Sequence, residues 1–149
     1  MTSLKQIEDF IAAVPVAMVG VSRNPKKFGY TAFKELKEKG LNIIPVNLVA
    51  DEILGVKAYP NVTSLPPEVQ GIIIMTKKDQ TLGVVKEAKA KGIKNIWIQQ
   101  MADSKDALKE LEGSDINCIT GECILMHYKP HSVHKFHKAL KKFFGRLPK

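Results

Sequence analysis

The chain has 149 residues, of which 44% are hydrophobic and 26% are charged, and its formal net charge at pH 7 is +8. This length and apolar content fit a single globular domain with its own core and exclude a disordered chain. No apolar run approaches the roughly 20 residues needed to span a bilayer, and the N-terminus lacks the apolar segment of a signal peptide. We therefore expect a cytoplasmic protein with Cys118 and Cys123 as reduced thiols.

The first segments predict a helix and then a buried strand. Ser3 and Gln6 have the spacing of a capping box, and a helical apolar stripe follows until shortly before Pro15. Val16–Val19 is a short apolar run, typical of a strand that is buried on both faces. Gly20 ends this strand and permits a tight turn.

A basic loop and a helix follow this strand. The loop from Ser22 to Lys27 is polar, and beyond Gly29 apolar residues recur at helical spacing. The first amides of such a helix lack intrahelical partners, and the helix dipole adds partial positive charge there. The side chains of Arg23, Lys26 and Lys27 add further positive charge. We interpret the loop as a phosphate-binding site, with an ordinary solvated turn as the competing interpretation.

The rest of the chain alternates between predicted strands and helices. The loop-rich segment Asn47–Pro67 allows a short helix or turn at Asp51–Leu54. The expected strands are Asn42–Val46, Gly71–Met75, Asn95–Ile98 and Ile116–Ile119, and the expected helices are Asp79–Lys91, capped by Asp79, and Ser104–Leu111.

Three of these strands are preceded by a glycine that marks a helix end, at Gly40, Gly92 and Gly113. Alternating helices and strands imply a parallel sheet with helices on both faces. The predicted fold is therefore α/β: a Rossmann-like, doubly wound, mostly parallel five-stranded sheet, with ligands outside the carboxyl ends of its strands.

The residues at these strand ends suggest which nucleotide is bound. The loop reads G-x-S-x-x-P-x-x-x-G rather than the G-x-G-x-x-G of dinucleotide enzymes, and Asn47 stands where such enzymes carry an acid. An amide does not repel a nearby phosphate as a carboxylate does. Together with the basic loop, this favours a nucleotide with an additional phosphate: coenzyme A (CoA), with NADP as the alternative.

Several motifs occur in the order seen in a known family. They are Gly20-Val21-Ser22 with Pro25 and Gly29, then IIPVN (Ile43–Asn47), EILGVKAYPNVTSLP (Glu52–Pro66), WIQ (Trp97–Gln99) and finally Cys123. From about Ile7 to Cys123 the chain resembles the small stand-alone CoA-binding proteins, which are similar to the CoA-binding domain of the succinyl-CoA synthetase alpha subunit.

The resemblance implies a Rossmann-type fold that holds CoA. It places the Ser22–Gly29 loop on the pyrophosphate, the region of Val46 and Asn47 near the adenosine, and Thr76 and Lys77 where the pantetheine arm runs. The expected cofactor-binding residues are Gly20, Val21, Ser22, Arg23, Pro25, Lys26, Lys27, Phe28, Gly29, Tyr30, Val46, Asn47, Thr76, Lys77, Gln99 and Cys123.

The chain departs from the family pattern at two places. Ile73–Thr76 replaces an Asp-Val-Phe-Arg-like stretch, and Gly121-Glu122-Cys123 replaces Asp-Arg-Cys. The region that carries the phosphohistidine of the synthetase is missing, so no catalytic histidine is transferred to this chain.

The two cysteines have no second pair with which to form a zinc site. We expect Cys118 to pack in the core. Cys123 follows the last strand at the ligand edge. It is expected either to meet the CoA thiol in a mixed disulfide or to be buried structurally.

We expect two parts: a CoA-binding Rossmann-like domain at residues 1–126, as the resemblance implies, and a basic amphipathic C-terminal helix or tail at 127–149. The tail contains His127, His131, His134 and His137, but the lysines between them disfavour a metal site. Docking on its own domain is the default expectation for the apolar stripe of the tail. A protein partner, an acidic membrane surface or, less favoured, a nucleic acid stays open.

No nucleophile–base set, pair of loop carboxylates or metal motif stands out, so we expect binding of CoA or an acyl-CoA without catalysis. The alternatives are an NADP-dependent oxidoreductase, for which a proton donor is missing, and an adaptor whose basic tail binds polyanions. The expected partner is a small nucleotide ligand.

Overall fold

The computed structural model describes residues 2–128. Its main sheet contains five parallel strands in the order β2-β1-β5-β6-β7. These strands are β1 (Val16–Val19), β2 (Ile43–Val46), β5 (Gly71–Ile74), β6 (Asn95–Gln99) and β7 (Asn117–Glu122). The predicted Rossmann-like α/β fold is confirmed.

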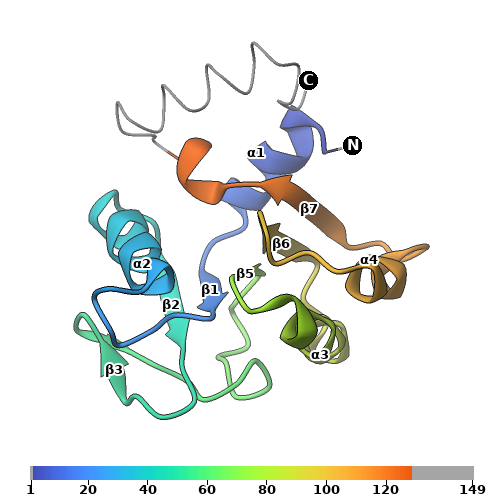
Figure 1. The fold of residues 1–149 in the computed structure, drawn as a ribbon. Helices are drawn as coiled ribbons and strands as arrows, with labels where there is room; N and C mark the ends of the chain where they lie inside the picture. Colours follow the sequence, from blue (N-terminus) through green and yellow to red (C-terminus); the bar gives the residue numbers. More distant parts are fainter. Residues whose placement is uncertain (1, 129–149) are drawn as a thin grey trace.

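Helices cover both faces of the sheet (Figure 1). On one face lie α1 (Leu4–Ala12) and α2 (Phe28–Glu38), and on the other lie α3 (Lys78–Lys91) and α4 (Lys105–Leu111). A short 3-10 helix, η1 (Ile124–Met126), follows β7. The fully buried strands β1 and β5 are apolar because each of their faces packs against a helical layer.

Alternate side chains along the strands point to opposite faces of the sheet and pack in two separate hydrophobic cores. Met18, Ile73 and Trp97 join the core under α1 and α2, whereas Ala17 and Ile72 join the core under α3 and α4. This alternation follows from the period of two along a strand.

The strand order places a topological switch at the centre of the sheet. From β1 the chain first adds β2 on one side, and it later adds β5 on the other side. Ligands bind at such a switch because the loops leaving the two strands diverge there. A Cβ atom on Gly20 would lie 2.6 Å from the carbonyl oxygen of Met75, so the carboxyl ends of β1 and β5 meet closely.

Two local predictions need correction. In the segment Asp51–Leu54, expected as a short helix or turn, Glu52 and Ile53 instead form strand β3 (Glu52–Ile53). Leu54 does lie in a turn, which joins β3 to β4 (Val56–Lys57) in an antiparallel hairpin. The N-cap of α3 is Lys77 rather than Asp79, which lies in the first turn of the helix. A carboxylate in the first turn still interacts favourably with the helix dipole, which explains why the two positions look alike in sequence.

The expected boundary between residues 126 and 127 falls within the described part of the chain. His127 and Tyr128 pack against the domain: the His127 Nε2 atom lies 3.1 Å from a carboxylate oxygen of Glu122, and the Tyr128 carbonyl accepts a hydrogen bond from Lys39. The rest of the predicted tail, 129–149, lies outside the described residues. Between residues 2 and 128, none of the helices has both the length and the apolar character needed to cross a membrane.

Candidate functional site

The basic loop after β1 is shaped by its own polar groups. The Ser22 hydroxyl accepts a hydrogen bond from the amide of Asn24 at 3.0 Å. The Asn24 side chain accepts from the amide of Lys26, and the Asn24 carbonyl accepts from the amide of Lys27, each at 3.0 Å. Such local side-chain bonds fix a turn without regular structure. Arg23, Lys26 and Lys27 are exposed on this turn.

Helix α2 begins directly after this loop without a side-chain cap. Its N-cap is Lys27, an unusual residue at this position, whereas Ser3 and Ser104 cap α1 and α4 through their hydroxyl groups. The amides of the first turn of α2 therefore have neither an intrahelical acceptor nor a side-chain cap. Together with the helix dipole, they form a site that suits an anion.

A close contact between two glycines holds this helix end over the carboxyl end of β1. A Cβ atom on Gly29 would lie only 2.3 Å from the carbonyl oxygen of Gly20. Gly20 itself has a φ of 98°, in the left-handed region that glycine adopts without steric cost. Both glycines of the loop motif are therefore required by geometry, and they bring the α2 amides to the strand switch.

Asn47 lies at the end of β2 beside the same loop, but its side chain is bonded to the backbone. Its Nδ2 atom donates to the carbonyl of Val21 at 2.8 Å, and its Oδ1 atom accepts from the amides of Val49 and Ala50. Asn47 thus connects the loops that follow β1 and β2. The neighbouring Val46 is buried, and Leu48 and Val49 are exposed apolar residues on the loop beyond.

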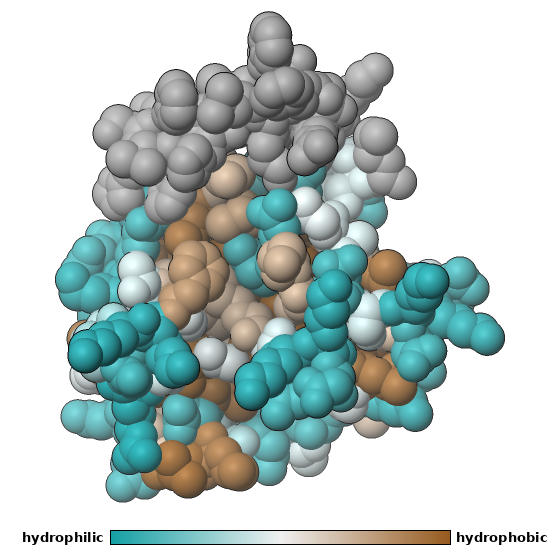
Figure 2. Space-filling model, viewed as in Figure 1, coloured by the Kyte–Doolittle hydropathy of each residue, from teal (hydrophilic) through white to brown (hydrophobic). Residues whose placement is uncertain are grey.

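A cavity of about 180 Å³ opens at the carboxyl ends of β5 and β6. Its lining includes three of the predicted residues: Phe28, Thr76 and Gln99. The remaining lining residues are Met75, Gln100, Met101 and Ala102. On the face shown in Figure 2, apolar side chains gather between α2 and α3, with hydrophilic side chains on either side. The cavity lies next to the basic loop after β1, because Phe28, the first residue of α2, lines it.

Sequence reasoning missed the two methionines of this cavity. Met101 is exposed and adopts a φ of 79°, which is uncommon for a residue other than glycine. No sequence pattern announces this conformation. Met75 follows β5 directly and could have been found from its place at a strand end, as Thr76 was.

Other predicted residues lie around the cavity in different roles. Lys77 is exposed and is the N-cap of α3, which also lacks a side-chain cap. Gln99 is buried, and its side-chain oxygen accepts a hydrogen bond from the amide of Ile124, which ties η1 to the end of β6. Tyr30 is partly buried against the core under α1 and α2.

Cys123 is buried in that same core and is not among the described residues that line the cavity. This placement favours the structural role over a mixed disulfide with CoA. Cys118 packs at the edge of the other core, and burial raises the pKa of its thiol to about 11. At neutral pH the Cys118 thiol is therefore protonated and is a poor nucleophile.

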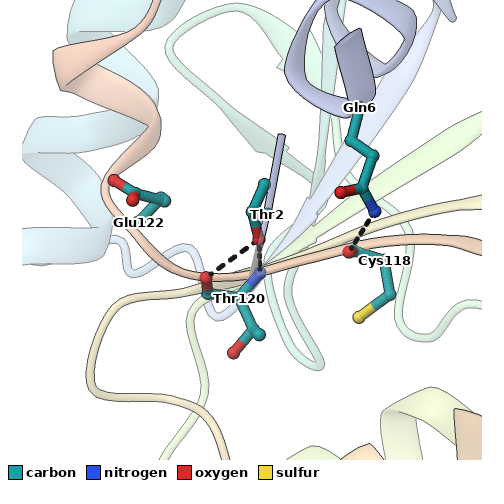
Figure 3. Close-up of a pocket in the computed structure, with 5 residues that line it drawn as sticks. All are labelled: Thr2, Gln6, Cys118, Thr120 and Glu122. Atoms are coloured by element: carbon teal, nitrogen blue, oxygen red, sulfur yellow. Dashed lines mark hydrogen bonds between the residues drawn. The ribbon is translucent and has the colours of Figure 1, made fainter. Parts of the chain in front are cut away.

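A second cavity, of about 280 Å³, lies between the start of α1 and the edge strand β7 and contains none of the predicted site residues. Figure 3 shows Thr2 and Gln6 against this strand. The Thr2 hydroxyl pairs with the backbone of Thr120, and the Gln6 amide donates to the carbonyl of Cys118 at 3.3 Å. The side chains of Thr2 and Gln6 thus form hydrogen bonds with backbone groups on the free edge of β7.

Comparisons with known proteins show the family to which the chain belongs. Residues 15–129 match the family described as CoA binding domain. Over 84 residues, 56% of this chain, the sequence is 42% identical to the ADP-forming acetate–CoA ligase II subunit alpha of Pyrococcus furiosus. That segment makes up only 18% of the ligase subunit.

Two smaller proteins resemble the chain over most of their length. The uncharacterized protein YneT of Bacillus subtilis is 28% identical over 109 residues, which cover 73% of this chain and 81% of YneT. A conserved hypothetical protein from Pyrococcus furiosus has a solved structure that matches this one with a TM-score of 0.71 and a sequence identity of 38%. The match covers 74% of this chain and 95% of that protein. The chain described here belongs to the CoA binding domain family.

Proposed function

We propose that this chain binds CoA, free or as an acyl thioester, at the carboxyl ends of β1, β5 and β6, without catalysing a reaction of its own. The pyrophosphate would lie on the loop Ser22–Gly29 and the first turn of α2. The adenosine part would lie near Val46 and Asn47, and the pantetheine arm would run along the cavity lined by Phe28 and Thr76.

The observation that carries this proposal is the uncapped start of α2 beside three exposed cations. Serine hydroxyls cap the starts of α1 and α4, whereas the starts of α2 and α3 have no side-chain cap, and α2 follows a loop with three cationic side chains. Here the polar side chains of the loop bond within their own turn, while Arg23, Lys26 and Lys27 remain exposed. Backbone amides and cations in this arrangement match a diphosphate.

The chemistry of the cavity supports binding without catalysis. Among the described residues that line it, none has a side chain that titrates near neutral pH: the lining consists of Phe, Met, Thr, Gln and Ala residues. Such a surface can hold a methylene-rich arm but offers no general acid or base. The ligase relative is several times longer than its matched segment, so we propose for this chain only the CoA-binding part of such an enzyme.

Isothermal titration calorimetry with CoA, dephospho-CoA, NADP and NAD tests the proposal. We expect CoA to bind more tightly than dephospho-CoA because the basic loop also attracts the 3′-phosphate. Binding of NADP with no binding of CoA would support the oxidoreductase alternative, and absence of binding by all four would refute a nucleotide site. Intact-mass analysis of the purified native protein adds an independent check, since retained CoA would be visible directly.

A further inference from the structure

A short chain of hydrogen bonds begins behind the cavity and ends at its wall. The Thr81 hydroxyl is completely buried in the first part of α3. It donates to the carbonyl oxygen of Ala102 at 2.7 Å and lies 3.2 Å from the carbonyl oxygen of Lys77. Its third neighbour is the hydroxyl of Thr76, at 2.9 Å. Thr76 and Ala102 both line the cavity, and Thr81 lies behind them.

The number of hydrogens available decides which group donates in each hydrogen bond of the Thr81 hydroxyl. A hydroxyl carries one hydrogen, and a carbonyl oxygen can only accept. The contact of 2.7 Å to the Ala102 carbonyl requires the Thr81 hydrogen, because two oxygens that close repel each other without one. Thr81 must therefore accept in its contact with Thr76, and the hydrogen of Thr76 lies between the two hydroxyls. The Thr76 oxygen is left with lone pairs alone.

We propose that Thr76 is an acceptor-only group that selects an N–H donor on the ligand, and that Thr81 is the positioning residue that imposes this polarity. The inference rests on the proposed function and makes it more specific. The pantetheine arm of CoA carries two secondary amides, each with one N–H group. The ligand group recognised by Thr76 is one of these amide hydrogens, while Phe28, Met75 and Met101 contact the methylene groups beside it.

The alternative polarity would have a different consequence. If Thr76 kept its hydrogen for the ligand, the residue would pair equally well with an amide, an ester or a ketone oxygen. Acceptor-only polarity instead penalises a ligand that presents an oxygen at this point, because two acceptors then face each other without a hydrogen. Discrimination between an amide and an ester at a single position of the arm is therefore the specific signature of this arrangement.

The test uses the full chain and calorimetric titration with four ligands. These are CoA, two CoA analogues in which one or the other amide N–H is replaced by an ester oxygen, and adenosine 3′,5′-bisphosphate, which lacks the pantetheine arm. The variants are Thr76→Val, Thr81→Val and Thr81→Ser. Thr120→Val is the matched control, since the buried Thr120 hydroxyl has no hydrogen-bond partner among the described residues and lies on β7, away from this cavity.

For the wild type we expect one of the two ester analogues to bind roughly tenfold more weakly than CoA. Thr76→Val should lose affinity for CoA by a similar factor and no longer distinguish CoA from that analogue. Thr81→Val should also lose the discrimination, because Thr76 can then turn its hydrogen toward the ligand, whereas Thr81→Ser should keep it. Affinity for adenosine 3′,5′-bisphosphate should be unchanged in all variants, and Thr120→Val should behave as wild type.

Equal binding of CoA and both ester analogues by the wild type would overturn the inference and leave the proposed function standing. Unchanged CoA affinity in Thr76→Val would do the same. If neither CoA nor adenosine 3′,5′-bisphosphate binds the wild type, the proposed function itself fails, and the inference fails with it. Because Thr81 is buried, circular dichroism melting of each variant accompanies the titrations, and Thr76→Val tests the acceptor role even if Thr81→Val does not fold.

Discussion

The side-chain amide of Asn47 donates a hydrogen bond of 2.8 Å to the backbone carbonyl of Val21, across 26 positions in the sequence. The same side chain accepts hydrogen bonds from the amides of Val49 and Ala50. One residue thus fastens the loop that follows β1 to the loop that follows β2. Both polar atoms of the Asn47 side chain therefore bond to the backbone, and the residue holds the two loops together.

Asn47→Ala should reduce both stability and affinity. The substitution removes three hydrogen bonds at once and leaves partly buried backbone groups unpaired, so we expect the free energy of unfolding to fall by about 2 kcal/mol. Affinity for CoA should also fall, because the loop after β1 loses its connection to β2. Urea denaturation and calorimetry measure the two effects. Asn42→Ala, at the exposed position just before the same strand, is the matched control, and an equal loss there would contradict the role of Asn47.

The two substitutions Gly29→Ala and Gly83→Ala should have opposite effects on stability. A Cβ at Gly29 would meet the Gly20 carbonyl at 2.3 Å, so we expect a loss of about 2 kcal/mol and a displaced start of α2. Gly83 lies inside α3, and a Cβ added there would meet no atom within 4 Å, so alanine should stabilise the fold by about 0.5–1 kcal/mol. Thermal melting distinguishes the signs. CoA affinity should fall only in Gly29→Ala, and intact binding in that variant would argue against the phosphate site.

The double variant Arg23→Ala/Lys26→Ala should bind CoA about tenfold more weakly at low ionic strength. The difference from wild type should shrink as salt is added, because both side chains are exposed and their charges are screened. Removing the same number of charges on the exposed surfaces of α3 and α4, in Lys86→Ala/Lys109→Ala, controls for net charge. An unchanged dissociation constant in the loop variant would remove these side chains from the site.

Cys118 should make stability depend on pH in the alkaline range. Burial raises the pKa of its thiol from the ordinary value of 9.0 to about 11. Between these two values the unfolded chain releases the proton while the folded chain retains it, so the free energy of unfolding should decrease as the pH rises from 9 toward 11. Below pH 9 this group should have no effect on the slope. Urea denaturation across this range, compared with Cys118→Ala, measures the contribution, and an identical slope in the variant would refute it.

The same thiol should react slowly at neutral pH. The thiolate is the nucleophile, and burial disfavours it at Cys118. Alkylation by iodoacetamide at about pH 8, followed by peptide mass spectrometry, should modify Cys118 more slowly than free cysteine. Rapid labelling in the folded protein would show that the thiol is accessible and charged.

The order of helices and strands, and the loop between two glycines that follows the first strand, could be predicted from the amino-acid sequence alone. The apolar run Val16–Val19, the glycines Gly20 and Gly29, and the capping box of Ser3 and Gln6 all act through neighbours within a few positions. Strand propensity, capping and left-handed turns are local properties, so a single sequence is enough to predict them. The small errors, at Asp51–Leu54 and at Asp79, fall where a turn, a cap and a first helical turn share the same residue types.

The contacts between distant side chains could not be predicted from the sequence. Asn47 donates a hydrogen bond to the carbonyl of Val21, Thr81 donates one to the carbonyl of Ala102, and Cys123 is buried in the core under α1 and α2. Each of these relationships joins segments that are brought together by the packing of several strands and helices. The direction of a side chain at such a junction depends on the competition between distant hydrogen-bond partners and burial, and that competition exists only once the chain has folded.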